Sequence, residues 1–237
     1  MATEGQRAEE VVRVVADGIA PARIVRSKRR TIALVVTADA TLIVRAPFSA
    51  PLAAIEDIIS KKSSWIRRTI VTVASRPPAP RKQFTDGEEF LYLGRNYPLS
   101  IVDDGAFSFD GGAFRLPRRC LPDARQAFTG WYREEAFRVI RERLDRYSAA
   151  SALVYDRYTV TGARSRWGSC AGRGDVSFSW RLIMAPLEVI DYVVVHELVH
   201  IEQKDHSRRF WDKVGCILPL HEQNRRWLKT NGHLLTI

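Results

Sequence analysis

The chain of 237 residues is 46% hydrophobic and 10% aromatic, which excludes a largely disordered protein and allows a sizeable buried core. Its formal net charge of +10 favours acidic partners such as nucleic acid, nucleotides or an anionic surface, although scattered basic residues also occur simply as solvated charge. Three widely spaced cysteines without a CxxC pair predict neither a disulfide framework nor a cysteine zinc site, and they fit a reducing compartment.

The sequence carries no sign of a targeting or membrane segment. It starts MATEGQRAEEVVRVVADG, which is polar and acidic where a secretory signal is basic and then apolar. No apolar run approaches the ~20 residues that cross a bilayer. We therefore expect a cytoplasmic protein without a membrane partner, whose residues 1–21 form a flexible leader. The oligomeric state is not predicted.

Residues 22–120 are expected to form an N-terminal, β-rich α+β unit with one helix. β-rich runs predict a hairpin over 31–47, which turns at Ala38-Asp39-Ala40. Apolar residues at helical spacing then predict a helix over about 50–75, with Ser49 as its N-cap. The following RPPAP cannot continue a helix and ends it.

Two more hairpins complete this unit before a long helix connects it to the back half. The first spans about 89–102, and the second spans about 106–117 with a strong Asp-Gly-Gly turn signal. A long amphipathic helix is predicted from about 122 to 150, at the start of a second domain that covers residues 121–237.

Strands and then three shorter helices are predicted for the rest of this domain. Gly172 to Gly174 marks a turn between two strands, the second of which runs over about 175–183. Helices are expected over about 187–203, 208–218 and 220–230. The predicted fold class is therefore α+β.

The stretch VVVHELVHIEQKDHS contains three of the chain's five histidines, His196, His200 and His206. His196 and His200 are four residues apart, so one helix face carries both imidazoles within reach of one ion. With Glu197 they form an HExxH arrangement, in which two histidines bind the metal and the carboxylate serves a metal-activated water. His206, after the helix, can supply a third ligand and leave the fourth position open, which is typical of catalytic zinc.

This cluster predicts metal-assisted hydrolysis with Zn²⁺ as the cofactor, although another divalent transition metal suits the same ligands. Glu197 is the expected general base and acid. The alternative is two histidines that are hydrogen-bonded in a core and a third on the surface. The metal site is favoured because the other faces of this helix are apolar, so it is expected to be buried, and two histidines and a glutamate on a buried helix would be costly without a partner.

Other residues near the motif are candidates for supporting roles. Tyr192 lies one turn before His196, where it either contacts a ligand or the substrate or only packs. Asp191 complements the helix dipole. Glu202 and Asp205 are both candidates to hold an imidazole N–H, and the sequence does not choose between them.

The segments ARSRWGSC, WRLIMAPLEVIDYVVVHELVH and DHSRRFW, together with RSKRRTIALVVTADATLIVRAP and KKSSWI, resemble the YgjP-like metallopeptidase family, relatives of the SprT-like zincins. The resemblance covers about residues 22–230. It implies a zincin-like minimal metallopeptidase domain, with the three histidines as zinc ligands and Glu197 as the catalytic acid/base. Metzincins have a glycine where this chain has Gln203, so a metzincin proper is not implied. Some YgjP-like proteins are described as nucleoside triphosphate pyrophosphatases, which leaves the substrate open.

The stretch RSRWGSC, residues 164–170, is expected to line the site. Zincins place a strand beside the active-site helix, and the edge of that strand can hold an extended substrate. Arg164, Arg166 and Ser169 are therefore candidate substrate-binding residues, either for a peptide or for phosphate. The alternative is a structural hairpin in which Trp167 packs.

Three functions remain open from the sequence. The first is a zinc metallopeptidase that acts on a peptide or protein. The second is a metal-dependent nucleoside triphosphate pyrophosphatase or phosphohydrolase at the same site. The third is a DNA-associated adaptor with a mainly structural zinc, which would need a fourth protein ligand that the sequence does not offer. A basic cluster of Arg26, Lys28, Arg29 and Arg30 is compatible with weak nucleic-acid association or with solvated charge.

Overall fold

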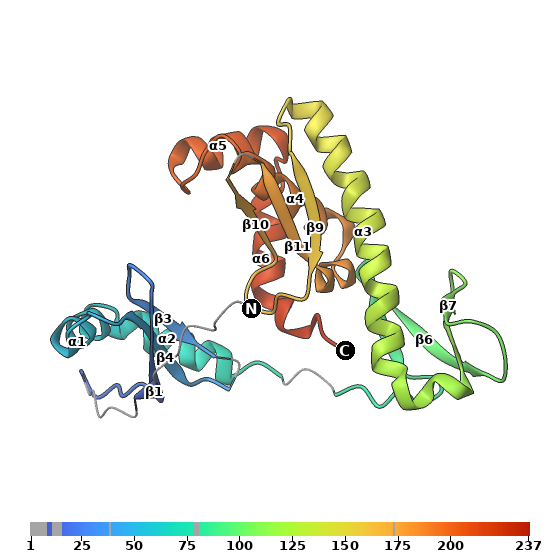
Figure 1. The fold of residues 1–237 in the computed structure, drawn as a ribbon, viewed down its shortest axis with the longest axis horizontal. Coiled ribbons are helices and arrows are strands. Elements are labelled where there is room, and N and C mark those ends of the chain that lie inside the picture. The colour runs from blue at the N-terminus through green and yellow to red at the C-terminus, as the bar shows by residue number, and fades with distance from the viewer. Residues whose placement is uncertain (1–8, 11–15, 38, 78–80, 173) are drawn as a thin grey trace, which may run out of the picture. The chain divides into compact units, whose positions relative to one another are not determined.

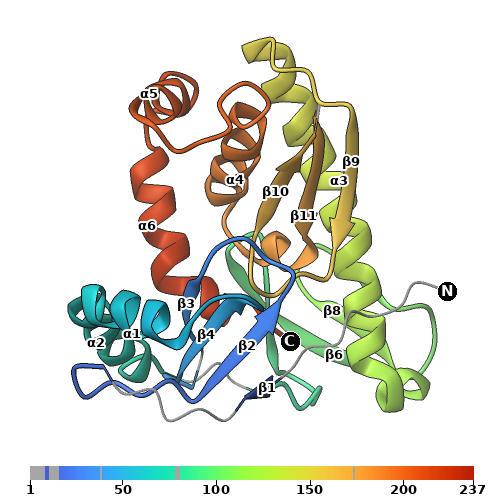
Figure 2. The ribbon, with the colours of Figure 1, turned by 60° about the vertical axis from the view of Figure 1, so that its left-hand side comes forward.

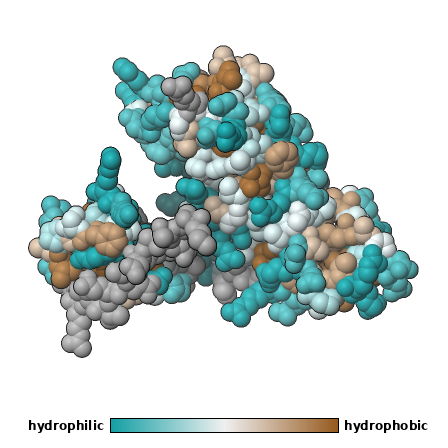
Figure 3. All heavy atoms as spheres, viewed as in Figure 1, coloured by the Kyte–Doolittle hydropathy of each residue, from teal (hydrophilic) through white to brown (hydrophobic). Residues whose placement is uncertain are grey.

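The computed structural model describes the whole chain except residues 1–8, 11–15, 38, 78–80 and 173 (Figure 1). It has a mixed α+β fold that divides into two compact units, Met1–Pro78 and Ala79–Ile237. On the face drawn in Figure 3, hydrophobic residues form separate patches among hydrophilic ones. Among the described residues, no helix combines the length and the hydrophobicity that spanning a bilayer requires.

The first unit is built on a four-stranded sheet of order β1-β2-β4-β3. Its strands are β1 (Glu9–Glu10), β2 (Arg23–Ser27), β3 (Ala33–Val36) and β4 (Leu42–Pro47). β3 and β4 pair antiparallel, which confirms the hairpin predicted over 31–47. β2 runs parallel to β4. It was not predicted, because its short sequence, RIVRS, has too many charged residues to indicate a strand.

Two helices, α1 (Leu52–Lys61) and α2 (Ser63–Ala74), stand where one was predicted. Lys62, with φ −111° and ψ 9°, interrupts them. Fully buried Ile59 and Ile66 from either side of the break enter the same core, so the apolar periodicity runs through it and conceals it. Ser49 as N-cap was wrong, since the extended residue before α1 is Pro51.

Part of the predicted flexible leader is tied to this unit. Residues 1–8 and 11–15 lie outside the described residues, but Glu9–Glu10 pair with β2 and Ile19 is 7% exposed in the core. Within the predicted basic cluster, Arg26 is also structural. Its Nη1 donates to the carbonyl oxygens of Pro47 at 3.1 Å and Ala50 at 2.7 Å.

The second unit opens with a sheet of order β5-β6-β8-β7. Antiparallel pairing of β5 (Glu89–Tyr92) with β6 (Arg95–Val102), and of β7 (Ser108–Phe109) with β8 (Phe114–Pro117), confirms both predicted hairpins. The predicted long helix follows as α3 (Ala124–Ser151).

The boundary between units differs from the one predicted near residue 120. Phe90 of β5 stacks on Phe128 of α3 with ring centroids 4.1 Å apart, and Phe114 of β8 lies 5.1 Å from the same ring. These aromatic side chains bury the hairpins against the long helix. The sheet and α3 therefore share one core, and the unit begins at Ala79.

A second sheet of this unit has the order β10-β11-β9 (Figure 1). β10 (Gly168–Ala171) pairs antiparallel with β11 (Asp175–Ser179), and β9 (Arg157–Thr161) runs parallel to β11. The strand predicted over 175–183 was too long, because Trp180–Met184 form a 3₁₀ helix. β10 is thus one edge of the sheet.

Three helices follow, α4 (Leu187–Val199), α5 (Arg208–Ile217) and α6 (His221–Asn231). α4 lies beside β10 and α6 (Figure 2) and is buried almost throughout. The prediction that this helix runs to about residue 203 was too long, because α4 ends at Val199 and His200 is its C-cap. The other two helices match the predicted ones closely.

Candidate metal centre

Three imidazoles meet at the end of α4. His196 lies in the last turn of this helix, His200 caps its end, and His206 lies in the loop before α5. One ring nitrogen from each residue lies within 4.8 Å of the other two, and Nε2 of His196 is 3.1 Å from Nε2 of His206. The structure therefore brings together the three histidines that the sequence singled out.

These separations suit one zinc ion. Zinc binds imidazole nitrogen at about 2.0–2.1 Å in a tetrahedron, which places neighbouring ligand atoms ~3.4 Å apart. The 3.1 Å between Nε2 of His196 and Nε2 of His206 is close to that separation. Among the described residues, the group contains three donors and no fourth, so one position would stay open for water or substrate.

The backbone fixes the orientation of His200. Its Nδ1 lies 2.9 Å from the carbonyl oxygen of Gln203. A carbonyl can only accept a hydrogen bond, so Nδ1 carries the proton and the Nε2 lone pair of the neutral ring is free for a metal.

Phe210, at the start of α5, forms an apolar base under the cluster. It is fully buried, and its ring centroid lies 4.9, 4.6 and 4.8 Å from those of His196, His200 and His206. Burial, reinforced by the charges of His200 and His206, lowers the pKa of His196 to about 3. The ring is thus held in the neutral form that a metal requires.

Glu197 lies beside the ligands rather than among them. It is 6% exposed, because β10 packs over it. The backbone of Cys170, on that strand, donates a hydrogen bond to its carboxylate. A Cβ placed on Gly168 would stand 2.6 Å from both Cγ and Oε1 of Glu197, so only glycine fits there without displacement. Burial raises the pKa of Glu197 to about 7, although Arg166 and the Cys170 hydrogen bond act in the opposite direction.

A small cavity of about 190 Å³ opens between α4, β10 and α6. It opens onto both His196 and the carboxylate of Glu197. Its lining includes His196, Glu197, Tyr192, Gly168, Trp167 and Leu228.

Comparison with known proteins identifies the family. A family model described as "YgjP-like, metallopeptidase domain" matches residues 30–231. The chain belongs to this family. No curated protein and no solved structure matches it. Membership supports a metal-dependent hydrolase that uses a divalent metal.

Of the four predicted substrate-binding residues of this YgjP-like chain, some lie near the cavity and Glu197 and others do not. Tyr192 lines the cavity, with its ring 5.8 Å from that of His196. Arg166 is exposed, and its charge acts on Glu197. Arg164 is exposed too, and the group on which its charge acts is Arg181. Ser169 bonds Ser177 at 2.9 Å and points away from Glu197, because side chains alternate along β10.

Neither candidate for holding an imidazole N–H does so. Glu202 pairs with Lys213, and Asp205 accepts from the Ser207 backbone at 3.1 Å. Asp191 does more than complement a dipole, because it forms a buried ion pair with Arg143 on α3 at 2.5 Å. That partner lies 48 residues away in sequence, and no local pattern announces it.

Two residues that were not predicted from the sequence also shape the site of this YgjP-like chain. Phe210 supports the ligands, and its signal was an apolar residue shortly after His206. Gly168 makes room for Glu197, and its signal was a glycine inside a β-rich run, which often marks close approach of another chain segment.

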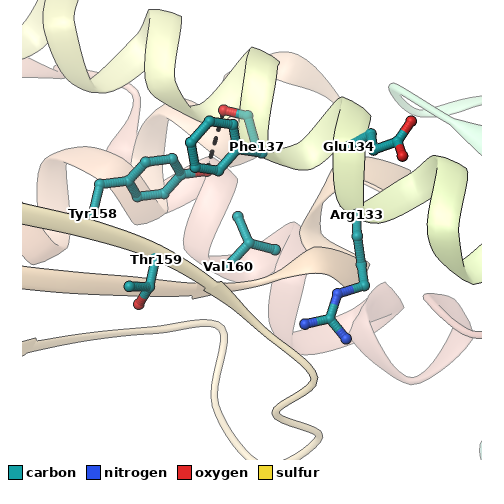
Figure 4. A pocket seen from close by; sticks show the side chains of 6 residues that line it. All are labelled: Arg133, Glu134, Phe137, Tyr158, Thr159 and Val160. Carbon is teal, nitrogen blue, oxygen red and sulfur yellow. Dashed lines mark hydrogen bonds between the residues drawn. The ribbon is translucent and has the colours of Figure 1, made fainter.

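A larger hollow of about 520 Å³ lies elsewhere, between α3 and β9 (Figure 4). Phe137 stacks on Tyr158 there at 5.1 Å, and the tyrosine hydroxyl donates to the carbonyl of Ala136 at 3.1 Å. None of the three clustered histidines and no part of Glu197 lines it, so it does not belong to the candidate metal centre.

Substitution of Gly168 by alanine should reduce turnover without removing metal. The new Cβ would displace Glu197, and a misplacement of ~1 Å can cost about 10²-fold in rate. We expect kcat/KM to fall by about 10²-fold while zinc content, measured by atomic absorption, stays unchanged. Ser169→Ala on the same strand is the matched control and should stay within about 2-fold of the parent. Full activity of Gly168→Ala would show that the carboxylate position is not critical.

Proposed function

We propose that the chain is a zinc-dependent hydrolase, and specifically a metallopeptidase. The observation that carries this proposal is the convergence of three histidine nitrogens within 4.8 Å beside the buried carboxylate of Glu197. A structural zinc, as in an adaptor, would be closed by four protein ligands, and the described residues offer three.

The residues divide the chemistry between them. Zinc, when bound, supplies a Lewis acid that polarises the electrophile and makes water more acidic. Glu197 accepts the proton of the attacking water and passes it to the leaving group. Phe210 and the apolar flank of α4 keep bulk water away from the back of the site.

The position of β10 favours a peptide substrate. β10 is an edge strand of its sheet, and its Gly168 contacts the catalytic carboxylate. An extended peptide can add to such an edge through main-chain hydrogen bonds. This would bring a scissile peptide bond beside Glu197.

A nucleoside triphosphate is the second candidate substrate. The exposed guanidinium of Arg166 acts on the Glu197 carboxylate, and that of Arg225 acts on His196 and His206. Guanidinium groups match phosphate oxygens in charge and geometry. The same metal and carboxylate would then serve hydrolysis of a phosphoanhydride.

A parallel assay separates these candidates. The zinc-loaded full chain is incubated with a peptide library and with the four nucleoside triphosphates, and products are read by mass spectrometry. We expect peptide cleavage that disappears with 1,10-phenanthroline, returns with added Zn²⁺, and is absent from His200→Ala. Hydrolysis of triphosphates alone would replace the peptidase proposal by the second candidate, and hydrolysis of neither would overturn both.

A further inference from the structure

One charged residue of the last α-helix stands beside the histidine cluster. Arg225 lies on α6, is exposed, and has no acidic partner among the described residues. Its guanidinium is nevertheless held in place, with Cζ 4.6 Å from the centroid of the Trp211 ring. A cation fixed by an aromatic ring and left without an anion is available to a negatively charged ligand.

Ring contacts connect Arg225 to the metal ligands. The Trp211 ring stacks on His206 with centroids 5.7 Å apart and lies 5.8 Å from His196. Leu228, one helical turn after Arg225, lines the cavity that holds His196 and Glu197. α6 thus presents both Leu228 and Arg225 on the side where the ligands lie.

The electrostatic field of Arg225 reaches the same groups. Burial and the neighbouring histidines lower the pKa of His196 and His206, and the positive charge of Arg225 adds to that lowering. Burial raises the pKa of Tyr192, and Arg225 acts against that rise. Burial also raises the pKa of Glu197, and the arginine whose charge lowers it is Arg166 instead.

We propose that Arg225 stabilises the negative charge that develops on the substrate oxygen during hydrolysis. This role rests on the proposed function. When water adds to the electrophilic carbon, Glu197 takes the water proton and the carbonyl π pair moves onto oxygen. That oxyanion is the partner of Arg225. The pair then returns, the carbon–nitrogen bond breaks, and the proton goes from Glu197 to the leaving amine.

The competing role for Arg225 is purely structural. Its contact with Trp211 could hold that ring, and through it His206, in position. A structural role would change the affinity for zinc when the arginine is removed. An oxyanion role would leave zinc binding intact and weaken only the binding of anions and the chemical step.

The test uses inorganic phosphate as a tetrahedral anion and needs no turnover. Zinc-loaded full-length protein, freed of excess metal, is titrated with phosphate by calorimetry. We expect Arg225→Met to weaken phosphate binding at least 10-fold, because a charge-assisted pair is lost. Arg225→Lys keeps the charge and should stay within about 3-fold. Arg226→Met, which removes the same charge from the next position of α6, should stay within about 2-fold.

Kinetics supply the second measurement. On whichever substrate the wild type cleaves, Arg225→Met should lower kcat about 10²–10³-fold with KM nearly unchanged, as for loss of an oxyanion donor. Wild-type protein that holds zinc but no phosphate would overturn the proposal. So would equal losses in Arg225→Met and Arg226→Met, or loss of zinc from Arg225→Met. Phosphate binding that depends on Arg225 in a protein that hydrolyses nothing would support the anion site and overturn the proposed function.

Discussion

Glu197→Gln should lower kcat by about 10²–10⁴-fold while the protein still binds one zinc ion. Glutamine has the same size and keeps a hydrogen-bond acceptor for the Cys170 backbone, but it cannot take up a proton. Glu197 lies outside the group of three ligand nitrogens, so zinc binding should not depend on its charge. The measurements are steady-state kinetics on the substrate found in the parallel assay and zinc content by atomic absorption.

The control for this substitution lies on the same helix. Glu188 is exposed in the first turn of α4, so Glu188→Gln removes the same charge without touching the site. We expect it to retain kcat within about 2-fold. Turnover by Glu197→Gln at the wild-type rate would show that another group moves the proton.

The metal cluster could be predicted because its geometry is mostly local. Four residues along a helix bring His196 and His200 to one face, and His206 needs only a short loop to reach them. The HExxH spacing therefore carries most of the three-dimensional information about the ligands. The same reasoning places Glu197 next to them but does not reveal what covers it.

The rest of the site depends on contacts between distant elements. Gly168 meets Glu197 across 29 positions of sequence, and only the packing of β10 on α4 makes that glycine necessary. Arg225 comes from the last helix, where nothing in its neighbourhood distinguishes it from Arg226. Ser169 was selected as a polar residue in the right segment. Because side chains alternate along β10 and Gly168 faces Glu197, Ser169 points to the other face, where it bonds Ser177.

For the fold, too, local features could be predicted and features that depend on distant contacts could not. Hairpins and helices with strong local signals were predicted within a few residues, whereas the boundary between units was not. That boundary depends on aromatic packing of Phe90 against Phe128, two residues that belong to elements predicted to lie in different domains. The break at Lys62 was hidden because the apolar periodicity continues through it.

Arg143→Met should destabilise the second unit by about 3–5 kcal/mol, which is the cost of leaving a buried charge without its partner. Nε and Nη2 of Arg143 donate to the two carboxylate oxygens of Asp191 at 2.5 and 2.7 Å, and the hydroxyl of Tyr147 donates to the same group at 3.0 Å. Arg143 and Asp191 are only 7% and 6% exposed. Removal of the arginine would leave a buried carboxylate without its partner on α4, five residues before His196, the first of the three candidate ligands.

Urea unfolding of the metal-free protein, followed by tryptophan fluorescence, measures this cost without a contribution from zinc binding. Arg141→Met is the matched control on α3, because its pair with Asp145 is exposed at the surface and should be worth under about 0.5 kcal/mol. The double variant Arg143→Met with Asp191→Asn removes the stranded charge and should recover part of the loss. If Arg143→Met were no less stable than Arg141→Met, the pair would not hold α4 against α3. The metal site would then depend on the apolar faces of those helices alone.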